Sequence, residues 1–332
     1  MSSPNLLITG ATGFIGFKVL IGALQEGYNV RAAVRSIEKS KYISSHPKIL
    51  ALGKADKLSF VEVPDICREG AYDEAVKGVS YVIHHASPLP SPFLDPQTGI
   101  YEPNVKSAST MLQSAQQEPS VKKVIVTFSV FANAPFPPDP NREITAESRV
   151  PDMPGPYDSM VPAYSAGKIA ALNATDRFVK DKQPHFEVIN VFPGFIFGWD
   201  DRALTLQDIF ASTNRMLLAV FTGQSSDIPM PAGAINVSDA AKVHLLALKE
   251  GAPKNIGVTI PHKFNDAWDV VQKHFPKAVA DGVFTQGNQP TVPVNWNAHK
   301  TEVDFGFKFR TYEDTVIDVA TQYLDLSGKE KA

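Results

Sequence analysis

Short apolar runs alternate with longer amphipathic stretches over the first 190 or so positions of the chain. The runs predict strands over residues 5–9, 29–34, 58–63, 79–84, 123–128 and 187–192. Between them, apolar positions recur at helical spacing over residues 14–26, 37–44, 69–77, 105–117 and 163–180. Gly27 directly follows the first of these stretches and is expected to end its helix. Such alternation predicts an α/β fold built on a doubly wound parallel sheet.

The alternation weakens after Pro193. Helical stretches over residues 206–221, 237–249 and 312–323 are mixed with loops, which predicts a smaller α+β domain. We therefore expect a first domain over residues 1–192 with a return segment at about 235–250. The second domain is expected to comprise residues 193–234 and 251–327, followed by a tail at 328–332.

Residues 134–162 differ from the rest of the chain because proline recurs throughout them. Such a stretch can be neither a regular helix nor a central strand. A long ordered loop in an α/β protein is usually functional or covers a site.

Composition and charge narrow the class of protein. The 332 residues are 43% hydrophobic, enough for a substantial core, and their net charge is only −3. The chain has no stripe of basic residues that would favour a nucleic acid or a membrane surface as partner. No apolar run is long enough to span a bilayer. The one cysteine, Cys67, cannot form an intramolecular disulfide and is expected to be a small, partly buried hydrophobe. Because the first residues lack the pattern of a signal peptide, we expect a cytoplasmic protein.

The first strand leads into a turn that contains Gly10, Gly13 and Gly16, and a helix follows. The first glycine permits a tight turn, the second lets a pyrophosphate approach the backbone, and the third lets the helix pack against the strand. The N-terminus of the helix then faces the anion. The pattern therefore predicts a dinucleotide site, with an ordinary tight turn as the alternative.

Tyr164 and Lys168 are four residues apart on a predicted helix and share a face. An ammonium group close to a phenol lowers its pKa from about 10, so the tyrosine can exchange a proton with a carbonyl or alcohol oxygen. Ser129 follows the fifth strand, where side chains of an open α/β sheet point toward ligands. We predict these three as catalytic residues, with Thr127 as the fallback for Ser129.

His84 and His85 raise the question of a metal. Adjacent residues of a strand point to opposite faces, and no further ligands have zinc spacing. No metal is expected.

The stretch Thr9-Gly-Ala-Thr-Gly-Phe-Ile-Gly16 resembles the extended branch of the short-chain dehydrogenase/reductase superfamily, and Ser129, Tyr164 and Lys168 match its Ser-Tyr-Lys set. Residues 30–35, 72–78 and 304–310 are similar to the group of dihydroflavonol 4-reductase, cinnamoyl-CoA reductase and fungal aldehyde/ketone reductases. Residues 160–168 depart from the motif typical of cinnamoyl-CoA reductases, which disfavours a CoA thioester. Phe128 also departs from the family's usual Thr-Ser-Ser.

The resemblance implies a Rossmann-type cofactor domain and an NADP(H) cofactor. Arg35 stands at the end of the second strand, where an NAD site has an acid, and could bind a 2′-phosphate with help from Lys39 or Lys41. Asp65 would contact the adenine amide, or instead cap a turn, and Pro193 would lie under the nicotinamide. The full set of predicted cofactor contacts is Thr9, Gly10, Thr12, Gly13, Phe14, Ile15, Gly16, Arg35, Lys39, Asp65, Ile66, Ala86, Ser87, Pro88, Tyr164, Lys168, Pro193 and Gly194.

The activity implied by the resemblance is an NADPH-dependent reduction of an aldehyde or ketone to an alcohol. The substrate would be a small molecule, such as a 4-keto flavonoid, an α-dicarbonyl or a secondary-metabolite ketone. Phe and Met residues would form either an apolar pocket or plain core; they are Phe131, Phe136, Phe195, Phe197, Met216, Phe221 and Met230. A sugar-nucleotide epimerase or dehydratase that retains NAD and a non-catalytic NADP(H)-sensing regulator are the alternatives. Monomer and homodimer both stay open.

Overall fold

The computed structural model describes residues 5–329, which form two compact units. The first unit extends through Pro137 and also includes Ala146–Phe192 and Ala241–Ile256. The second comprises Pro138–Thr145, Pro193–Ala240 and the chain from Gly257 onward. The short segment Pro138–Thr145 was not predicted to belong to the second unit. Residues 330–332 of the predicted tail lie outside the described residues.

A seven-stranded sheet forms the centre of the first unit, with strand order β10-β6-β5-β4-β1-β2-β3. Every neighbouring pair from β6 to β3 runs parallel. The strands are β1 (Asn5–Thr9), β2 (Asn29–Val34), β3 (Leu58–Glu62), β4 (Tyr81–His84), β5 (Lys123–Thr127), β6 (Glu187–Pro193) and β10 (Asn255–Val258). The predicted doubly wound α/β fold is therefore confirmed.

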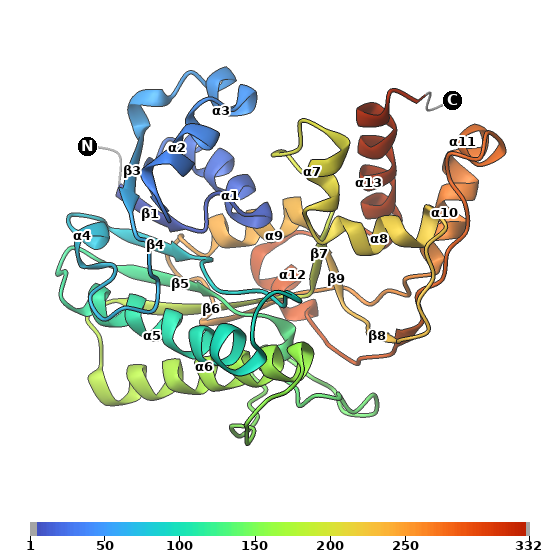
Figure 1. Cartoon of the computed structure of the whole chain (residues 1–332). Coiled ribbons are helices and arrows are strands. Elements are labelled where there is room, and N and C mark those ends of the chain that lie inside the picture. Colours follow the sequence, from blue (N-terminus) through green and yellow to red (C-terminus); the bar gives the residue numbers. More distant parts are fainter. Residues whose placement is uncertain (1–4, 330–332) are drawn as a thin grey trace. The chain divides into compact units, whose positions relative to one another are not determined.

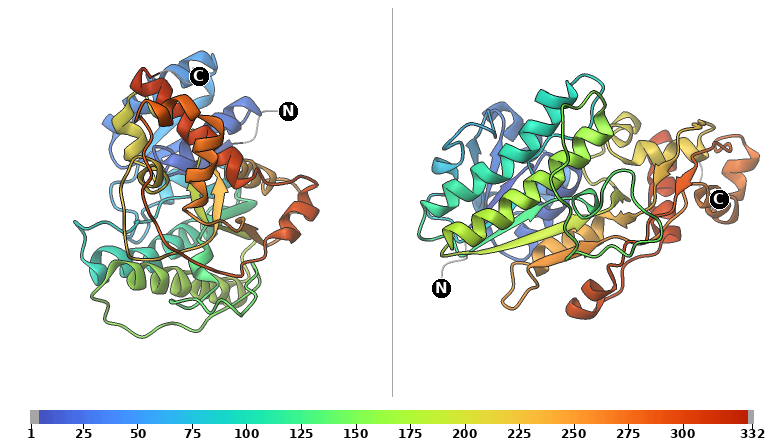
Figure 2. Two further views of the ribbon diagram at one scale, coloured as in Figure 1. Left: turned by 90° about the vertical axis from the view of Figure 1, so that its right-hand side faces the viewer. Right: turned by 90° about the horizontal axis from the view of Figure 1, so that it is seen from below.

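Helices cover both faces of this sheet. Helices α5 and α6 lie side by side on one face, and α1 and α2 lie on the other (Figures 1 and 2). The helices of this part are α1 (Phe14–Gln25), α2 (Ile37–Ser44), α3 (Pro47–Ala51), α4 (Asp73–Val76), α5 (Glu102–Gln116), α6 (Met160–Lys182) and α9 (Val237–Leu246), which continues from the second unit. Shorter helical turns are η1 (Ala55–Lys57), η2 (Pro96–Tyr101) and η3 (Val130–Ala132).

The second unit is a smaller α+β assembly. Its parallel strand pairs are β7 (Phe195–Phe197) with β9 (Ala234–Asn236), and β8 (Met230–Pro231) with β11 (Thr291–Val292). Its helices are α7 (Leu206–Phe210), α8 (Asn214–Phe221), α10 (Asp266–His274), α11 (Pro276–Ala280), α12 (His299–Phe305) and α13 (Tyr312–Ser327). Phe197 and Phe221 are fully buried in its core, so the core alternative holds for these two residues.

Several short elements, most of them in the second unit, were not predicted from the sequence, and three differences have a clear local cause. The edge strand β10 was missed because it is short and contains Gly257, which carries no strand signal. The predicted helix over residues 69–77 begins only at Asp73, because Gly70 has a left-handed φ of +70°. The predicted helix over residues 206–221 divides at Ser212, whose hydroxyl accepts a hydrogen bond from Asn214 N at 3.2 Å in place of the helical pattern.

The proline-rich stretch forms neither helix nor strand before α6 begins at Met160, as its composition predicts. Asn133, which directly precedes this stretch, bonds to its middle in the first unit. The Asn133 Nδ2 donates to the carbonyl oxygens of Ala146 at 3.3 Å and Ser148 at 3.0 Å.

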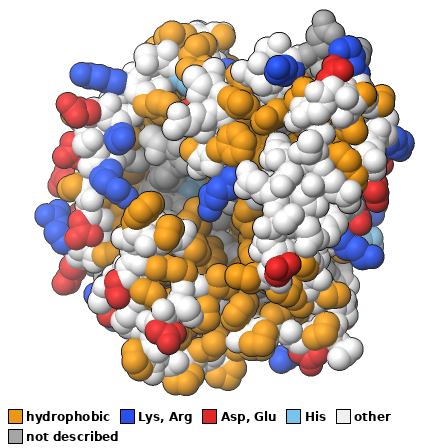
Figure 3. Space-filling model, turned by 45° about the vertical axis from the view of Figure 1, so that its right-hand side comes forward, with side chains coloured by type: hydrophobic (Ala, Val, Ile, Leu, Met, Phe, Trp, Pro, Cys, Tyr) orange, Lys and Arg blue, Asp and Glu red, His pale blue; other side chains and the backbone are white. Residues whose placement is uncertain are grey.

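Lys and Arg side chains are interspersed with Asp and Glu over the face drawn in Figure 3, without a large patch of one sign. Between residues 5 and 329, no helix has the length and apolarity needed to cross a bilayer.

Candidate active site

A tight turn joins β1 to α1 and brings Gly10 against the end of β4. Gly10 has a φ of +70°, a conformation that favours glycine. A Cβ atom on Gly10 would lie 3.1 Å from His85 Cβ, and one on Gly16 would lie 2.2 Å from the carbonyl oxygen of Gly10. No side chain caps the N-terminus of α1 at Gly13. The turn therefore has the close backbone approach and the helix N-terminus that a phosphate group needs.

The Thr9 side chain is hidden beneath this turn. Thr9 is 1% exposed, and its Oγ1 accepts a 3.0 Å hydrogen bond from Ala86 N. The same Oγ1 shares a 2.9 Å hydrogen bond with His84 Nδ1. The Thr9 side chain thus fastens the carboxyl end of β1 to that of β4. It holds the two strand ends beside the turn in place.

The segment that follows β4 connects the glycine turn to helix α6. Lys168 Nζ donates a 2.8 Å hydrogen bond to Ser87 Oγ. The carbonyl oxygen of Pro88 accepts a 3.1 Å hydrogen bond from Asn104 Nδ2 on α5. Asn104 is 2% exposed and was not predicted as a site residue.

Ser129 and Tyr164 lie next to each other, from the end of β5 and the first turns of α6. Their side chains share a hydrogen bond, which favours a lower pKa of the phenol. Burial outweighs it and raises the pKa of Tyr164 to about 12. The lowered phenol pKa expected from the sequence is therefore wrong. The ring of Phe131 contacts the Tyr164 ring edge to face at 5.9 Å.

Lys168 is one helical turn beyond Tyr164 and is 3% exposed. Its Nζ lies 5.6 Å from the centroid of the Tyr164 ring. Burial lowers the pKa of Lys168 to about 7. Near neutral pH the lysine can therefore both carry a charge and exchange a proton, while the tyrosine keeps its proton.

Thr127, the fallback for Ser129, has other partners. Its Oγ1 shares hydrogen bonds with His85 Nδ1 at 2.8 Å and His244 Nε2 at 2.9 Å. His84 contacts Thr9 and His85 contacts Thr127, so the two adjacent histidines do not converge on one point. Across residues 5–329, no group of three or more His, Cys, Asp or Glu side chains is placed to hold a metal ion.

Arg35 and Lys39 lie just beyond the carboxyl end of β2, and both are exposed. Within the described chain, neither side chain forms a hydrogen bond or an ion pair. Two cations without protein partners at this strand end suit a phosphate group.

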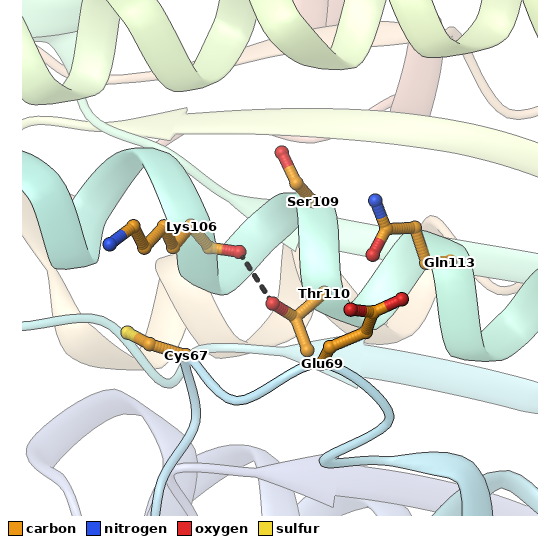
Figure 4. A pocket seen from close by; sticks show the side chains of 6 residues that line it. All are labelled: Cys67, Glu69, Lys106, Ser109, Thr110 and Gln113. Carbon is orange, nitrogen blue, oxygen red and sulfur yellow. Dashed lines mark hydrogen bonds between the residues drawn. The ribbon is translucent and has the colours of Figure 1, made fainter.

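Asp65 and Ile66 lie in the loop after β3. One Asp65 oxygen accepts a 2.9 Å hydrogen bond from Cys67 N, so the residue does form a local turn, which was the alternative to an adenine contact. A surface pocket of about 280 Å³ lies beside this loop and is lined by Cys67, Glu69, Lys106, Ser109, Thr110 and Gln113 (Figure 4). It contains no predicted site residue, and burial raises the pKa of the Cys67 thiol, which disfavours a reactive thiolate.

Pro193 and Gly194 belong to the second unit. Gly194 N donates a 3.0 Å hydrogen bond to the Val258 carbonyl oxygen. A Cβ on Gly194 would lie 2.6 Å from the carbonyl oxygen of Gly233, so only glycine fits here without a shift. In the first unit, the structure thus brings together the glycine turn, residues 86–88, Ser129, Tyr164 and Lys168.

Comparisons with known proteins identify the family and the fold of this chain. The model of the NAD dependent epimerase/dehydratase family matches residues 6–259. Ketoreductase CTB6 of Cercospora beticola is 36% identical over 100% of this chain and 98% of its own length. NAD-dependent epimerase/dehydratase ALT6 of Alternaria alternata is 36% identical over 82% of this chain and 83% of its own. Yeast methylglyoxal/isovaleraldehyde reductase Gre2, solved complexed with NADPH, has a TM-score of 0.82 at 26% identity, covering 98% of this chain and 100% of that one.

Proposed function

This chain belongs to the NAD dependent epimerase/dehydratase family, the extended short-chain dehydrogenases/reductases, and we propose that it is an NADPH-dependent carbonyl reductase. The reaction is reduction of an aldehyde or ketone to an alcohol. The observation that carries the proposal is the connected set Ser129–Tyr164–Lys168–Ser87 beside the glycine turn. Ketoreductases and an NADPH-bound reductase among the similar proteins support the same class.

The residues present fit a dinucleotide that carries a 2′-phosphate. Gly10 permits the tight turn with its left-handed φ, and Gly16 lets α1 pack against that turn, because a Cβ there would lie 2.2 Å from the Gly10 carbonyl oxygen. No side chain covers the helix N-terminus at Gly13, where a pyrophosphate could approach. Arg35 and Lys39 supply cations where an acid would select the 2′-hydroxyl of NAD. When bound, the cofactor supplies the hydride that reduces the carbonyl carbon.

Tyr164 supplies the proton. Its raised pKa keeps the phenol protonated at neutral pH, which is the state that a reduction requires. As the carbonyl π bond breaks, the oxygen takes the Tyr164 proton and the product is an alcohol. The Ser129 hydroxyl, which is hydrogen-bonded to the Tyr164 side chain, orients and polarises the carbonyl oxygen of the substrate. Lys168 stabilises the phenolate that remains, because its ammonium lies close to the ring.

The substrate is proposed to be an apolar ketone or aldehyde. The Phe131 ring lies between the Tyr164 ring and that of Phe136, at centroid distances of 5.9 Å and 6.2 Å. An aromatic surface beside the proton donor favours an apolar substituent on the carbonyl.

The test is the loss of NADPH absorbance with a panel of aldehydes, α-diketones and aryl ketones, with NADH in parallel. We expect turnover with NADPH and at least tenfold less with NADH. NAD that co-purifies and stays bound through turnover would instead favour the epimerase or dehydratase. Tight NADPH binding with no turnover of any carbonyl would favour a cofactor-sensing regulator.

A further inference from the structure

His262 is a buried histidine of the second unit whose hydrogen bonding defines its protonation. It is 7% exposed, and its Nδ1 accepts a 3.0 Å hydrogen bond from Gly233 N. An imidazolium carries a proton on both nitrogens and could not accept this bond. His262 is therefore neutral with its proton on Nε2. Burial, which lowers the pKa of His262 to about 4, agrees with this state.

The ring is enclosed by aromatic side chains. It contacts Phe264 and Phe197 edge to face, with centroid distances of 4.6 Å and 6.3 Å, and Tyr312 at 5.0 Å. His262 Nε2 is buried without a hydrogen-bond partner. Of the two ring nitrogens, only Nδ1 therefore forms a hydrogen bond, and its partner is the backbone N–H of Gly233.

Gly233, which His262 holds through its N–H, also contacts the segment after β6. The Gly233 carbonyl oxygen accepts a 2.8 Å hydrogen bond from Phe195 N. A Cβ on Gly194 would lie only 2.6 Å from the same oxygen, so the two backbones touch. Gly233 itself has a φ of +118°, which a side chain rarely adopts. Its position depends on the bonds made by its N–H and its carbonyl oxygen.

We propose that His262 is a positioning residue that acts through Gly233 to hold the Pro193–Gly194–Phe195 turn. This inference rests on the proposed function and on the family resemblance, by which Pro193 would lie under the nicotinamide. A turn held in register keeps the nicotinamide ring at the right distance for hydride transfer. His262 thus affects the chemistry without touching substrate or cofactor.

Two variants separate this role from simple packing. His262→Phe keeps an aromatic ring among Phe197, Phe264 and Tyr312 but removes the acceptor. His262→Asn removes the ring but places an amide oxygen near the position of Nδ1. If His262 positions Gly233, the Asn variant keeps slow amide exchange at Gly233 and normal turnover, and the Phe variant loses both. If His262 only fills the core, the order is reversed.

The first readout is hydrogen exchange of the cofactor-free protein. In His262→Phe we expect the amides of Gly233 and Phe195 to exchange about tenfold faster, with amides of α13 unchanged, and in His262→Asn we expect nearly wild-type exchange. The second readout is steady-state kinetics with NADPH. We expect kcat of His262→Phe to fall about tenfold while the Kd of NADPH changes less than about threefold, because Arg35 and the glycine turn are intact.

Wild-type exchange at Gly233 and Phe195 in His262→Phe would overturn the inference, as would a larger defect in His262→Asn than in His262→Phe. A wild-type protein that turns over no carbonyl with NADPH would overturn the proposed function instead. The exchange experiment would still decide whether His262 holds the turn. Should His262→Phe fail to fold, His262→Leu provides the variant without an acceptor.

Discussion

The ammonium group of Lys168 donates a 2.8 Å hydrogen bond to Ser87 Oγ, which joins helix α6 to the segment that follows β4. Burial lowers the pKa of Lys168 to about 7, so its charge depends on this contact near neutral pH. Ser87 is in turn close to the glycine turn, because a Cβ on Gly10 would lie 3.3 Å from the nitrogen of Ala86. One polar contact thus links the proton-transfer residues to the proposed cofactor turn.

Removing the Ser87 hydroxyl should change the pH dependence of the reaction. Without this acceptor the charged form of Lys168 is less stable, so the pKa of Lys168 falls further. The reduction uses the ammonium form, and its alkaline limb should therefore move toward lower pH in Ser87→Ala, by about half a unit or more. Ser87→Thr, which keeps a hydroxyl, is the control. The pH profile of kcat/KM measures the shift, and identical profiles for both variants would contradict the assignment.

Tyr164→Phe should abolish turnover and spare cofactor binding. Loss of the proton donor should reduce kcat by about a thousandfold or more, while the Kd of NADPH, followed by its fluorescence, stays within about twofold. Tyr28→Phe, in the loop before β2, should behave like the wild type. Normal turnover by Tyr164→Phe would refute the mechanism.

Arg35 should select NADPH over NADH. Arg35→Ala should raise the Kd of NADPH by about ten- to a hundredfold, because a charge-assisted contact with the 2′-phosphate is lost. Binding of NADH should change little. Arg177→Ala, which alters an exposed arginine on α6, is the matched control. Equal loss of affinity for both nucleotides would show that Arg35 does not read the 2′-phosphate.

Gly16 and Gly13, in the proposed cofactor turn, should differ in how well they tolerate substitution by alanine. A Cβ on Gly16 would lie 2.2 Å from the Gly10 carbonyl oxygen, whereas a Cβ on Gly13 would lie 3.1 Å from it. Gly16→Ala should therefore force the turn to shift and weaken NADPH binding by about a hundredfold, whereas Gly13→Ala should weaken it by about tenfold, because its methyl group only crowds the approach of the pyrophosphate. Calorimetric titration of both variants measures this order. Equal affinities would mean that the turn can relax.

Buried neutral histidines should make the protein sensitive to acid. Burial lowers the pKa of His84 to about 3 and that of His262 to about 4, while unfolding restores a pKa near 6.5. Below about pH 6.5 the unfolded chain then binds more protons than the folded one. Stability should be fully present above this pH and fall as the pH drops toward 4.

Urea unfolding at pH 7.5 and pH 4.5 tests this expectation. Each such histidine contributes up to about 1.4 kcal/mol per pH unit in this window. The free energy of unfolding of His84→Asn should decrease less between the two pH values than that of the wild type. An equal or larger decrease in the variant would show that His84 is not responsible.

Local sequence signals were sufficient to predict most of the main sheet, the candidate site residues and the family of this protein. Strand and helix periods identified six strands of the main sheet, since alternation and helical spacing are properties of neighbouring residues. The glycine spacing, the Tyr164–Lys168 pair and Ser129 at a strand end also lie within short segments. The family follows from the same motifs. The strand β10 escaped prediction because four residues with a central glycine carry too little pattern.

Tertiary structure alone decided how these groups behave. The sequence pattern suggested an ammonium that lowers the pKa of Tyr164, but burial raises it to about 12. It also could not reveal that the Thr9 side chain faces His84 and Ala86, or that His262 holds Gly233. Burial and hydrogen bonding depend on side chains that are far apart along the chain. The sequence thus determined which chemical groups are present, and the packing of distant segments determined their protonation and their partners.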